Sequence, residues 1–311
     1  MNNQSDRSTP YPTAPQPAAP VPMPVTRPMY WSVRRELWEN RSIYIAPLIV
    51  AAVVLFATSL SMIGLPRRMR AFPTLDPAKG HASIASHFSL APAPIMLDAF
   101  IVGFFYCLDA LYGERRDRSI LFWKSLPVSD RTTVLSKAGI PFVVLPLLAY
   151  VLSVAAQIFL LILGTMALLG SGQNPATWWG EVRFFQGLLI LFDGLTVHTL
   201  WVAPIYGWLL LISAWARRSP ILWAVLPLLA VSAVERIVFG TSSFIHMLGY
   251  RVTGAMVEAF ALKPNGGGNI ERLSQLDPAK FLSAPGLWVG LAFAAVFLAA
   301  AVRLRRNREP I

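Results

Sequence analysis

The stretch "IPFVVLPLLAYVLSVAAQIFLLILGTMALLG", residues 140–170, contains no charged side chain. A bilayer core about 30 Å thick needs roughly 20 apolar residues in a helix, because hydrocarbon offers no partner to an open backbone N–H or C=O group. Outward from this stretch, further apolar runs meet the same requirement. The predicted spans are 43–63, 95–112, 140–170, 187–216, 221–240 and 287–304. The sequence therefore predicts an all-α, polytopic membrane protein with six transmembrane helices, which together form a domain over 43–304.

The third and fourth runs are longer than one span requires. Pro141 and Pro146 lie in the third run and Pro204 lies in the fourth. A proline inside a helix removes one backbone hydrogen bond and bends the chain, so we expect these two helices to kink, tilt or project beyond the bilayer.

The composition agrees with a lipid environment. Of the 311 residues, 55% are hydrophobic and 14% are charged, whereas soluble proteins approach about a quarter charged. The net charge of +11 is spread in short basic clusters beside the apolar runs, which is typical of membrane proteins. We therefore expect the lipid membrane, and no nucleic acid, as a partner.

The segments before the first span divide into two parts. Residues 1–28 are rich in proline and poor in large apolar residues, which predicts a disordered cytoplasmic tail. Residues 29–42 mix aromatic and charged side chains, which favours an elbow helix lying in the membrane interface, with aromatics at headgroup depth and charges in water. A plain positively charged flank is the alternative. The residues concerned are Trp31, Arg34, Arg35, Glu36, Leu37, Trp38 and Glu39.

The distribution of Lys and Arg predicts the orientation. Most of the 27 basic residues lie before the first span, in the 113–139 loop, at 217–218 and in the tail that includes 305–311. Because basic residues beside spans are retained on the cytoplasmic side, both termini are expected in the cytoplasm. The 241–284 segment is then an outer loop.

Motifs for catalysis and metal binding are not found. The sequence has no G-x-x-x-x-G-K-[ST] loop for phosphates, no H-E-x-x-H pair for zinc and no G-x-S-x-G nucleophile elbow. The histidines are scattered, and the single cysteine, Cys107, lies in an apolar run where a small buried hydrophobe is expected. We predict no catalytic residue, no metal and no enzyme activity of this chain alone.

Four polar residues fall inside the predicted spans. Asp98 and Asp109 lie in the second run, and Asp193 and His198 lie in the fourth. Charges at mid-bilayer cost roughly 2.5–3.5 kcal/mol on insertion scales, so such residues are candidates for a translocation path or proton transfer. The alternative is that the first two reach water near the span ends and Asp193 pairs within the bundle.

Two sequence patterns indicate helix packing. Gly286, Gly290 and Ala294 recur every four residues in the last run, a small-residue spacing that allows close approach of two helices, within the chain or across a dimer. Trp201, Trp208 and Trp215 recur every seven residues, a stripe more typical of packing or lipid contact than of a ligand site.

The 113–139 loop has an unusual order of residues. Its charged part is followed by an apolar part and then by "SLPVSD", where proline ends a helix and Ser129 or Asp130 can cap the next one. The pattern leaves two placements open, flat on the membrane or docked into a partner protein. The residues concerned are Glu114, Arg115, Arg116, Asp117, Arg118, Ile120, Leu121, Phe122, Trp123, Lys124 and Leu126.

The segment "YGERRDRSILFWKSLPVSDRTTVLSK", residues 112–137, resembles the loop between the second and third spans of ATP-binding-cassette (ABC) transporter permeases of the second, ABC2-like type. The resemblance covers about residues 28–308 and implies an elbow helix, six spans and cytoplasmic termini, in a protein of the inner membrane of a bacterium. It also implies that the loop carries a coupling helix, in which 114–118 set charge contacts and 120–126 fill a cleft on a separate ATPase subunit.

An ABC permease would move its substrate by alternating access, most often as an exporter, and would need a second permease half as a homo- or heterodimer. No cofactor is expected in this chain, because ATP and Mg²⁺ would bind to the ATPase. Two other classes remain open from the residues alone: a membrane-embedded enzyme that uses the intramembrane polar residues, and a non-transporting scaffold or regulatory subunit.

Overall fold

The computed structural model describes residues 26–71, 91–120, 128–182, 184–259 and 273–307, and every regular element in these ranges is helical. The elements in chain order are α1 (Thr26–Glu39), α2 (Ser42–Met62), α3 (Leu65–Ala71), α5 (Pro92–Ala110), α6 (Tyr112–Arg116), α8 (Asp130–Gly139), the π-helix η2 (Ile140–Val144), α9 (Leu145–Gly170), α10 (Ala176–Val182), α11 (Phe184–Trp201), α12 (Ala203–Trp215), α13 (Pro220–Phe239), α14 (Ser243–Thr253), α15 (Ala255–Ala259), the 3₁₀ turn η3 (Leu273–Gln275), α16 (Pro278–Ser283) and α17 (Pro285–Asn307).

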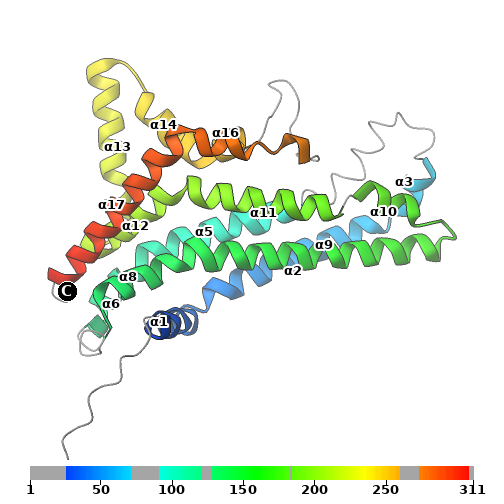
Figure 1. Ribbon diagram of the computed structural model, residues 1–311, viewed down its shortest axis with the longest axis horizontal. Helices are drawn as coiled ribbons and strands as arrows, with labels where there is room; N and C mark the ends of the chain where they lie inside the picture. Colours follow the sequence, from blue (N-terminus) through cyan, green and yellow to red (C-terminus); the bar gives the residue numbers. More distant parts are fainter. Residues whose placement is uncertain (1–25, 72–90, 121–127, 183, 260–272, 308–311) are drawn as a thin grey trace, which may run out of the picture.

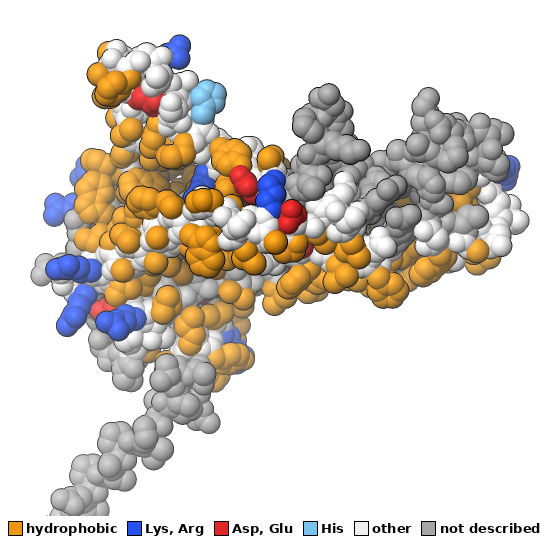
Figure 2. All heavy atoms as spheres, turned by 45° about the horizontal axis from the view of Figure 1, so that its top comes forward, with side chains coloured by type: hydrophobic (Ala, Val, Ile, Leu, Met, Phe, Trp, Pro, Cys, Tyr) orange, Lys and Arg blue, Asp and Glu red, His pale blue; other side chains and the backbone are white. Residues whose placement is uncertain are grey.

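Among the residues that the structure describes, six helices are long and apolar enough to cross a membrane. They are Ser42–Met62, Pro92–Arg116, Asp130–Gly170, Trp178–Trp201, Pro220–Phe239 and Pro285–Asn307. Hydrophobic side chains cover the length of the molecule, whereas many of the Lys and Arg residues visible in this view gather at one end (Figure 2). The all-α prediction and the prediction of six apolar helices are confirmed, as expected for a multi-pass membrane protein.

The long helices α2, α5, α9 and α11 run beside one another along the longest axis of the molecule (Figure 1). The main core lies among α2, α5, α9 and α12, and Cys107 is buried in it as expected. At one end, α1 packs on α8, and the last turns of α17 pack on α8 as well. We call this region, where α1, α6, α8 and the end of α17 meet, the charged end.

Both long apolar runs depart from regular α-helix. In the third run, the Leu145 N–H donates to the Ile140 carbonyl, which makes η2 a π-turn between Pro141 and Pro146. In the fourth run, Pro204 lacks the N–H that would continue the helix, and the chain bends at Val202 between α11 and α12. The predicted continuous span 187–216 is therefore two helices, and the expected kinks are present.

The helices α12 and α17 pack along each other through small residues. A Cβ atom on Gly207 would lie 3.1 Å from the Ala294 Cα, so a larger residue here would require the two helices to move apart slightly. A Cβ atom on Gly286 would lie 3.4 Å from the Trp201 ring, and one on Gly290 would clash with the Arg251 guanidinium. The Gly286, Gly290 and Ala294 spacing thus serves packing within the chain.

The tryptophan stripe also serves packing. Trp201 is buried and carries the Arg251 guanidinium 4.5 Å from its ring centre. Trp208 Nε1 donates to the Ala224 carbonyl at 3.1 Å, and Trp215 contacts Trp223 edge-on. The second and third rings therefore hold α13, which otherwise stands away from the bundle in Figure 1.

Candidate functional site

The charged end contains a group of six charged side chains from four helices, which we call the ionic cluster. Four of them are buried, and Arg35 and Asp130 are partly exposed. Its members are Arg35 and Glu36 of α1, Glu114 of α6, Asp130 and Lys137 of α8, and Arg305 of α17. Three cations face three carboxylates, so the cluster is formally neutral. Buried charges of this kind are tolerated only when they are paired and hydrogen-bonded.

Glu36 is the most buried member, with no exposed surface. Its Oε1 atom accepts hydrogen bonds from Lys137 Nζ at 2.9 Å and from Arg35 at 2.8 Å. Its Oε2 atom accepts from the Tyr106 hydroxyl of α5 at 2.8 Å. Both oxygens are thus satisfied, and α1 is fixed in rotation about its own axis.

Glu114 forms the second half of the cluster. Lys137 Nζ lies 3.2 Å from its Oε1 atom, so one ammonium bridges two carboxylates. Arg305 donates to Glu114 Oε2 at 2.9 Å and to Asp130 Oδ1 at 2.7 Å. Ion pairs therefore connect α17 to α6, at the beginning of the 113–139 loop, and to α8, at its end.

Arg115 extends the connection to α12. Its guanidinium donates to the carbonyls of Ser213 at 2.9 Å and Ala216 at 2.5 Å, which are free at the C-terminus of that helix. The Ser213 hydroxyl in turn accepts from the backbone N–H groups of Leu111 and Tyr112, each at 2.9 Å. The entrance to the loop is thus joined by hydrogen bonds to α12 as well as to α1 and α17.

The electrostatics of Glu36 follow from this geometry. Burial alone would raise the pKa of its carboxyl group, but the charge and hydrogen bond of Lys137, together with Arg35, hold that pKa below its ordinary value of 4.5. One turn along, burial raises the pKa of Glu39 despite the nearby Arg35 charge. The two carboxyl groups therefore contribute to the pH dependence of stability with opposite sign.

We expect the thermal unfolding midpoint of the purified protein in detergent to fall as the pH is lowered below 4.5, the ordinary pKa of a glutamate carboxyl group. The stabilisation from a carboxyl group with a lowered folded pKa is complete above its unfolded pKa and is lost as the pH falls towards the folded pKa. Glu36→Gln should make this loss shallower. Glu39→Gln is the matched control and should make it steeper, because its raised pKa gives stabilisation at low pH. Equal changes in slope for the two variants would contradict the assignment.

The structure corrects the expectation that the charges of α1 lie in water for Glu36, whereas Glu39 is exposed. Glu36 is buried, and the exposed side of α1 carries Trp31, Trp38 and Arg34, whose guanidinium lies 5.2 Å and 4.7 Å from the two ring centres. The helix also begins at Thr26 and ends at Glu39, earlier at both ends than the predicted 29–42.

The predicted partner residues separate into three groups. Glu114 and Arg115 are buried inside the chain, so they hold the loop in place and are not surface contacts. Arg116, Asp117 and Arg118 are exposed, and Arg116 pairs with Asp117 at 2.9 Å. Ile120 is buried, and the rest of the predicted coupling helix, with Leu121, Phe122, Trp123, Lys124 and Leu126, lies outside the described residues. After the loop, Ser129 caps α8 by accepting from the Thr132 N–H at 3.1 Å.

The four intramembrane polar candidates do not form one site. Asp98 and Asp193 are half-buried on different helices, and Asp109 is exposed near the charged end, 3.6 Å from Arg116. The His198 ring contacts Phe100 edge-on at 5.8 Å. Within the described ranges, no three His, Cys, Asp or Glu side chains come close enough to hold a metal ion.

Comparisons of the chain with protein-family models, with curated proteins and with solved structures give no match.

Proposed function

We propose that this chain is the membrane-spanning permease subunit of an ATP-driven ABC transporter of the ABC2-like type, acting as an exporter of a substrate that remains to be identified. The 112–137 segment carries this proposal, because its charged, apolar and proline-containing parts follow the order of a coupling loop. The ATPase would be a separate subunit, and a second permease subunit would complete the membrane pathway.

The ionic cluster supports the proposal physically. A partner can drive a conformational change only if its contacts differ between two states of a connected structure. The loop begins at α6 and ends at α8, and buried ion pairs connect both helices to α1 and α17. Motion imposed on the loop would therefore move the first and last helices together with the bundle.

The same cluster bears on orientation. It brings α1 and the end of α17 to the same end of the bundle as the loop. We propose that this end faces the cytoplasm of a bacterium, in agreement with the bias in Lys and Arg. The exposed charges at this end then include Arg116, Asp117 and Arg118, which would be available to an ATPase.

Copurification from the native host in mild detergent tests the proposal. We expect an ATPase chain with a phosphate-binding P-loop to copurify in stoichiometric amount, and ATP hydrolysis to require that chain. The isolated permease should not hydrolyse ATP, since no phosphate-cradling motif is present in its sequence. Hydrolysis that follows the isolated chain through repeated purification would contradict the proposal, and a complex without any P-loop chain would favour a scaffold or regulatory subunit instead.

A further inference from the structure

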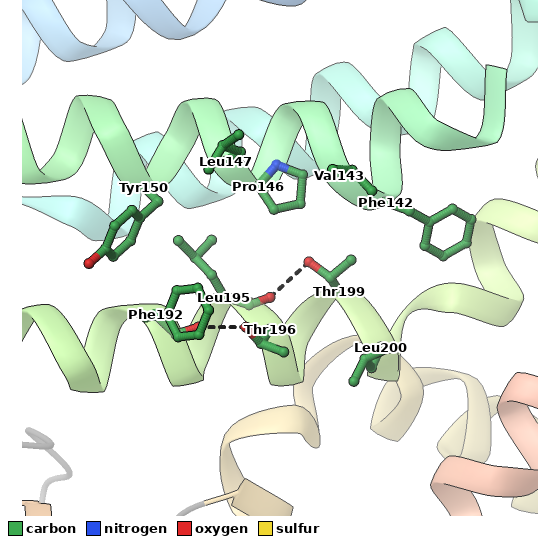
Figure 3. A pocket seen from close by; sticks show the side chains of 10 residues that line it. All are labelled: Phe142, Val143, Pro146, Leu147, Tyr150, Phe192, Leu195, Thr196, Thr199 and Leu200. Atoms are coloured by element: carbon green, nitrogen blue, oxygen red, sulfur yellow. Dashed lines mark hydrogen bonds between the residues drawn. The ribbon is translucent and has the colours of Figure 1, made fainter. Parts of the chain in front are cut away.

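A cleft between η2–α9 and α11 is separate from the ionic cluster, and none of its lining residues is a predicted site residue, although Asp193 and His198 lie on the same stretch of α11. Its volume is about 250 Å³, larger than the roughly 150 Å³ apolar cavity that suffices to bind benzene in another protein. Figure 3 shows the two walls facing each other. One wall runs from Phe142 to Tyr150 and the other from Phe192 to Leu200. At 1.5 Å per residue, each wall is about 12 Å long, so the cleft is elongated along the helices.

The lining is chemically apolar over most of its length. Its two threonine hydroxyls are engaged within their own helix, where Thr196 donates to the Phe192 carbonyl and Thr199 to the Leu195 carbonyl, both at 2.8 Å. The other lining residues are hydrophobic or aromatic. Because both threonine hydroxyls already donate, they offer a polar ligand only acceptor oxygens, and Tyr150 adds one phenol hydroxyl. A hydrocarbon chain needs no hydrogen-bond partner and loses nothing here.

The position of the cleft determines what can enter it. Both walls belong to helices that are apolar enough to cross a membrane. At its rim, Val143 is 60% exposed and Phe192 is 58% exposed, so the cleft opens to the side of the bundle. In a bilayer that side can be covered by lipid or by the second permease subunit proposed above. An occupant that enters from lipid must dissolve in the hydrocarbon region.

The cleft also lies against both irregular segments of the bundle. Phe142 and Val143 belong to the π-turn, and Leu200 comes two residues before the bend at Val202. Single π-turns occur frequently at functional sites, and interrupted membrane helices are found where ligands bind. An occupant at this end of the cleft would contact both irregular segments.

We propose that this cleft binds the hydrocarbon chain of a membrane amphiphile, such as a long-chain fatty acid or the acyl chain of a lipid. Binding requires the two walls of one chain only, so it is independent of the ATPase partner.

The test uses the full chain in nanodiscs with a palmitic acid analogue that carries a diazirine in the middle of its chain. After illumination, adducts are located by peptide mass spectrometry. We expect residues 142–150 and 192–200 to be labelled at least fivefold above α13, and excess palmitic acid to suppress that labelling. The apolar helix α13 is almost fully exposed and is the internal control, because contact with annular lipid would label it without saturation.

Two variants test whether the fatty acid binds in the cleft itself. Thr196→Phe and Leu147→Trp fill the cleft from opposite walls and should each reduce the saturable labelling at least fivefold. Leu189→Phe is the control. It enlarges a side chain on α11 seven residues before Thr196, outside the cleft, and should leave the labelling unchanged. Labelling of the cleft and α13 at similar, unsaturable levels would show annular lipid only and would overturn the proposal, as would the absence of adducts on both walls.

Discussion

Replacement of Lys137 by methionine is expected to lower the free energy of unfolding by about 3–5 kcal/mol, the usual cost of removing one partner from a buried ion pair. Methionine keeps the length and apolar stem of the side chain but removes its charge. Glu36 and Glu114 would then lie close together without the ammonium that bridges them at 2.9 Å and 3.2 Å. Only Arg35 would still contact both carboxylates, and it is partly exposed.

Arg131→Met is the matched control for this prediction. Arg131 lies on the same helix but is exposed, so the loss of its charge should change stability by no more than about 0.5 kcal/mol. The measurement is chemical or thermal unfolding in one detergent, followed by size-exclusion chromatography. Equal stability of the two variants would show that the cluster does not hold α1 to α8.

A double variant shows whether the loss of stability in Lys137→Met comes from uncompensated charge or from lost packing. In Glu36→Gln combined with Lys137→Met, a neutral amide replaces the carboxylate, and Glu114 keeps its contact with Arg305 at 2.9 Å. The double variant should therefore be more stable than Lys137→Met alone, because it leaves one fewer uncompensated buried charge. If the two variants are equally unstable, lost packing rather than charge explains the effect.

The sequence predicted the helices well because their signal is local. Each span is a run of apolar residues, and length alone identifies it. The kinks were also predictable, since Pro146 and Pro204 act on their own backbone. The ionic cluster was not predicted, because it joins residues as distant as Arg35 and Arg305, and their pairing depends on how the helices pack.

A local signal for part of the cluster was nevertheless present. Val33 and Leu37 of α1 pack against the core, and Glu36 lies between them at helical spacing. A carboxylate on an apolar face of a helix indicates a buried partner more often than contact with water. The sequence gives no comparable indication for the cleft, because its walls consist of the residue types that also face lipid.

Replacement of both Phe122 and Trp123 by alanine is expected to weaken association with the proposed ATPase by about 2–4 kcal/mol, if these aromatic side chains are the anchors of the interface. Both residues lie outside the described part of the structure, so the prediction rests on the resemblance and on the flanking geometry. Membrane insertion should be unchanged, since the six apolar helices dominate it. The readout is the amount of ATPase that copurifies, together with transport once a substrate is known.

Phe185→Ala is the control for the aromatic pair, because Phe185 is 80% exposed at the far end of α11. Charge reversal of Arg116 and Arg118 adds a second readout. Both residues are exposed, so an acidic cleft on the partner would bind these variants more weakly, and the difference would shrink at high salt. Arg115 is unsuitable for this test, since its reversal would disrupt the contacts with Ser213 and Ala216 inside the chain.

The measured stability of each variant distinguishes residues that hold the helices together from residues that bind the ATPase. Lys137→Met should unfold more easily, whereas Phe122→Ala with Trp123→Ala should lose the ATPase and keep the unfolding midpoint of the wild type. A membrane-surface helix at 120–126 predicts no loss of ATPase from the aromatic variant and no salt dependence from the charge reversal. If the aromatic double variant and the charge-reversal variant both copurify with the ATPase at full stoichiometry, the coupling assignment is wrong. Residues 120–126 then contact only lipid.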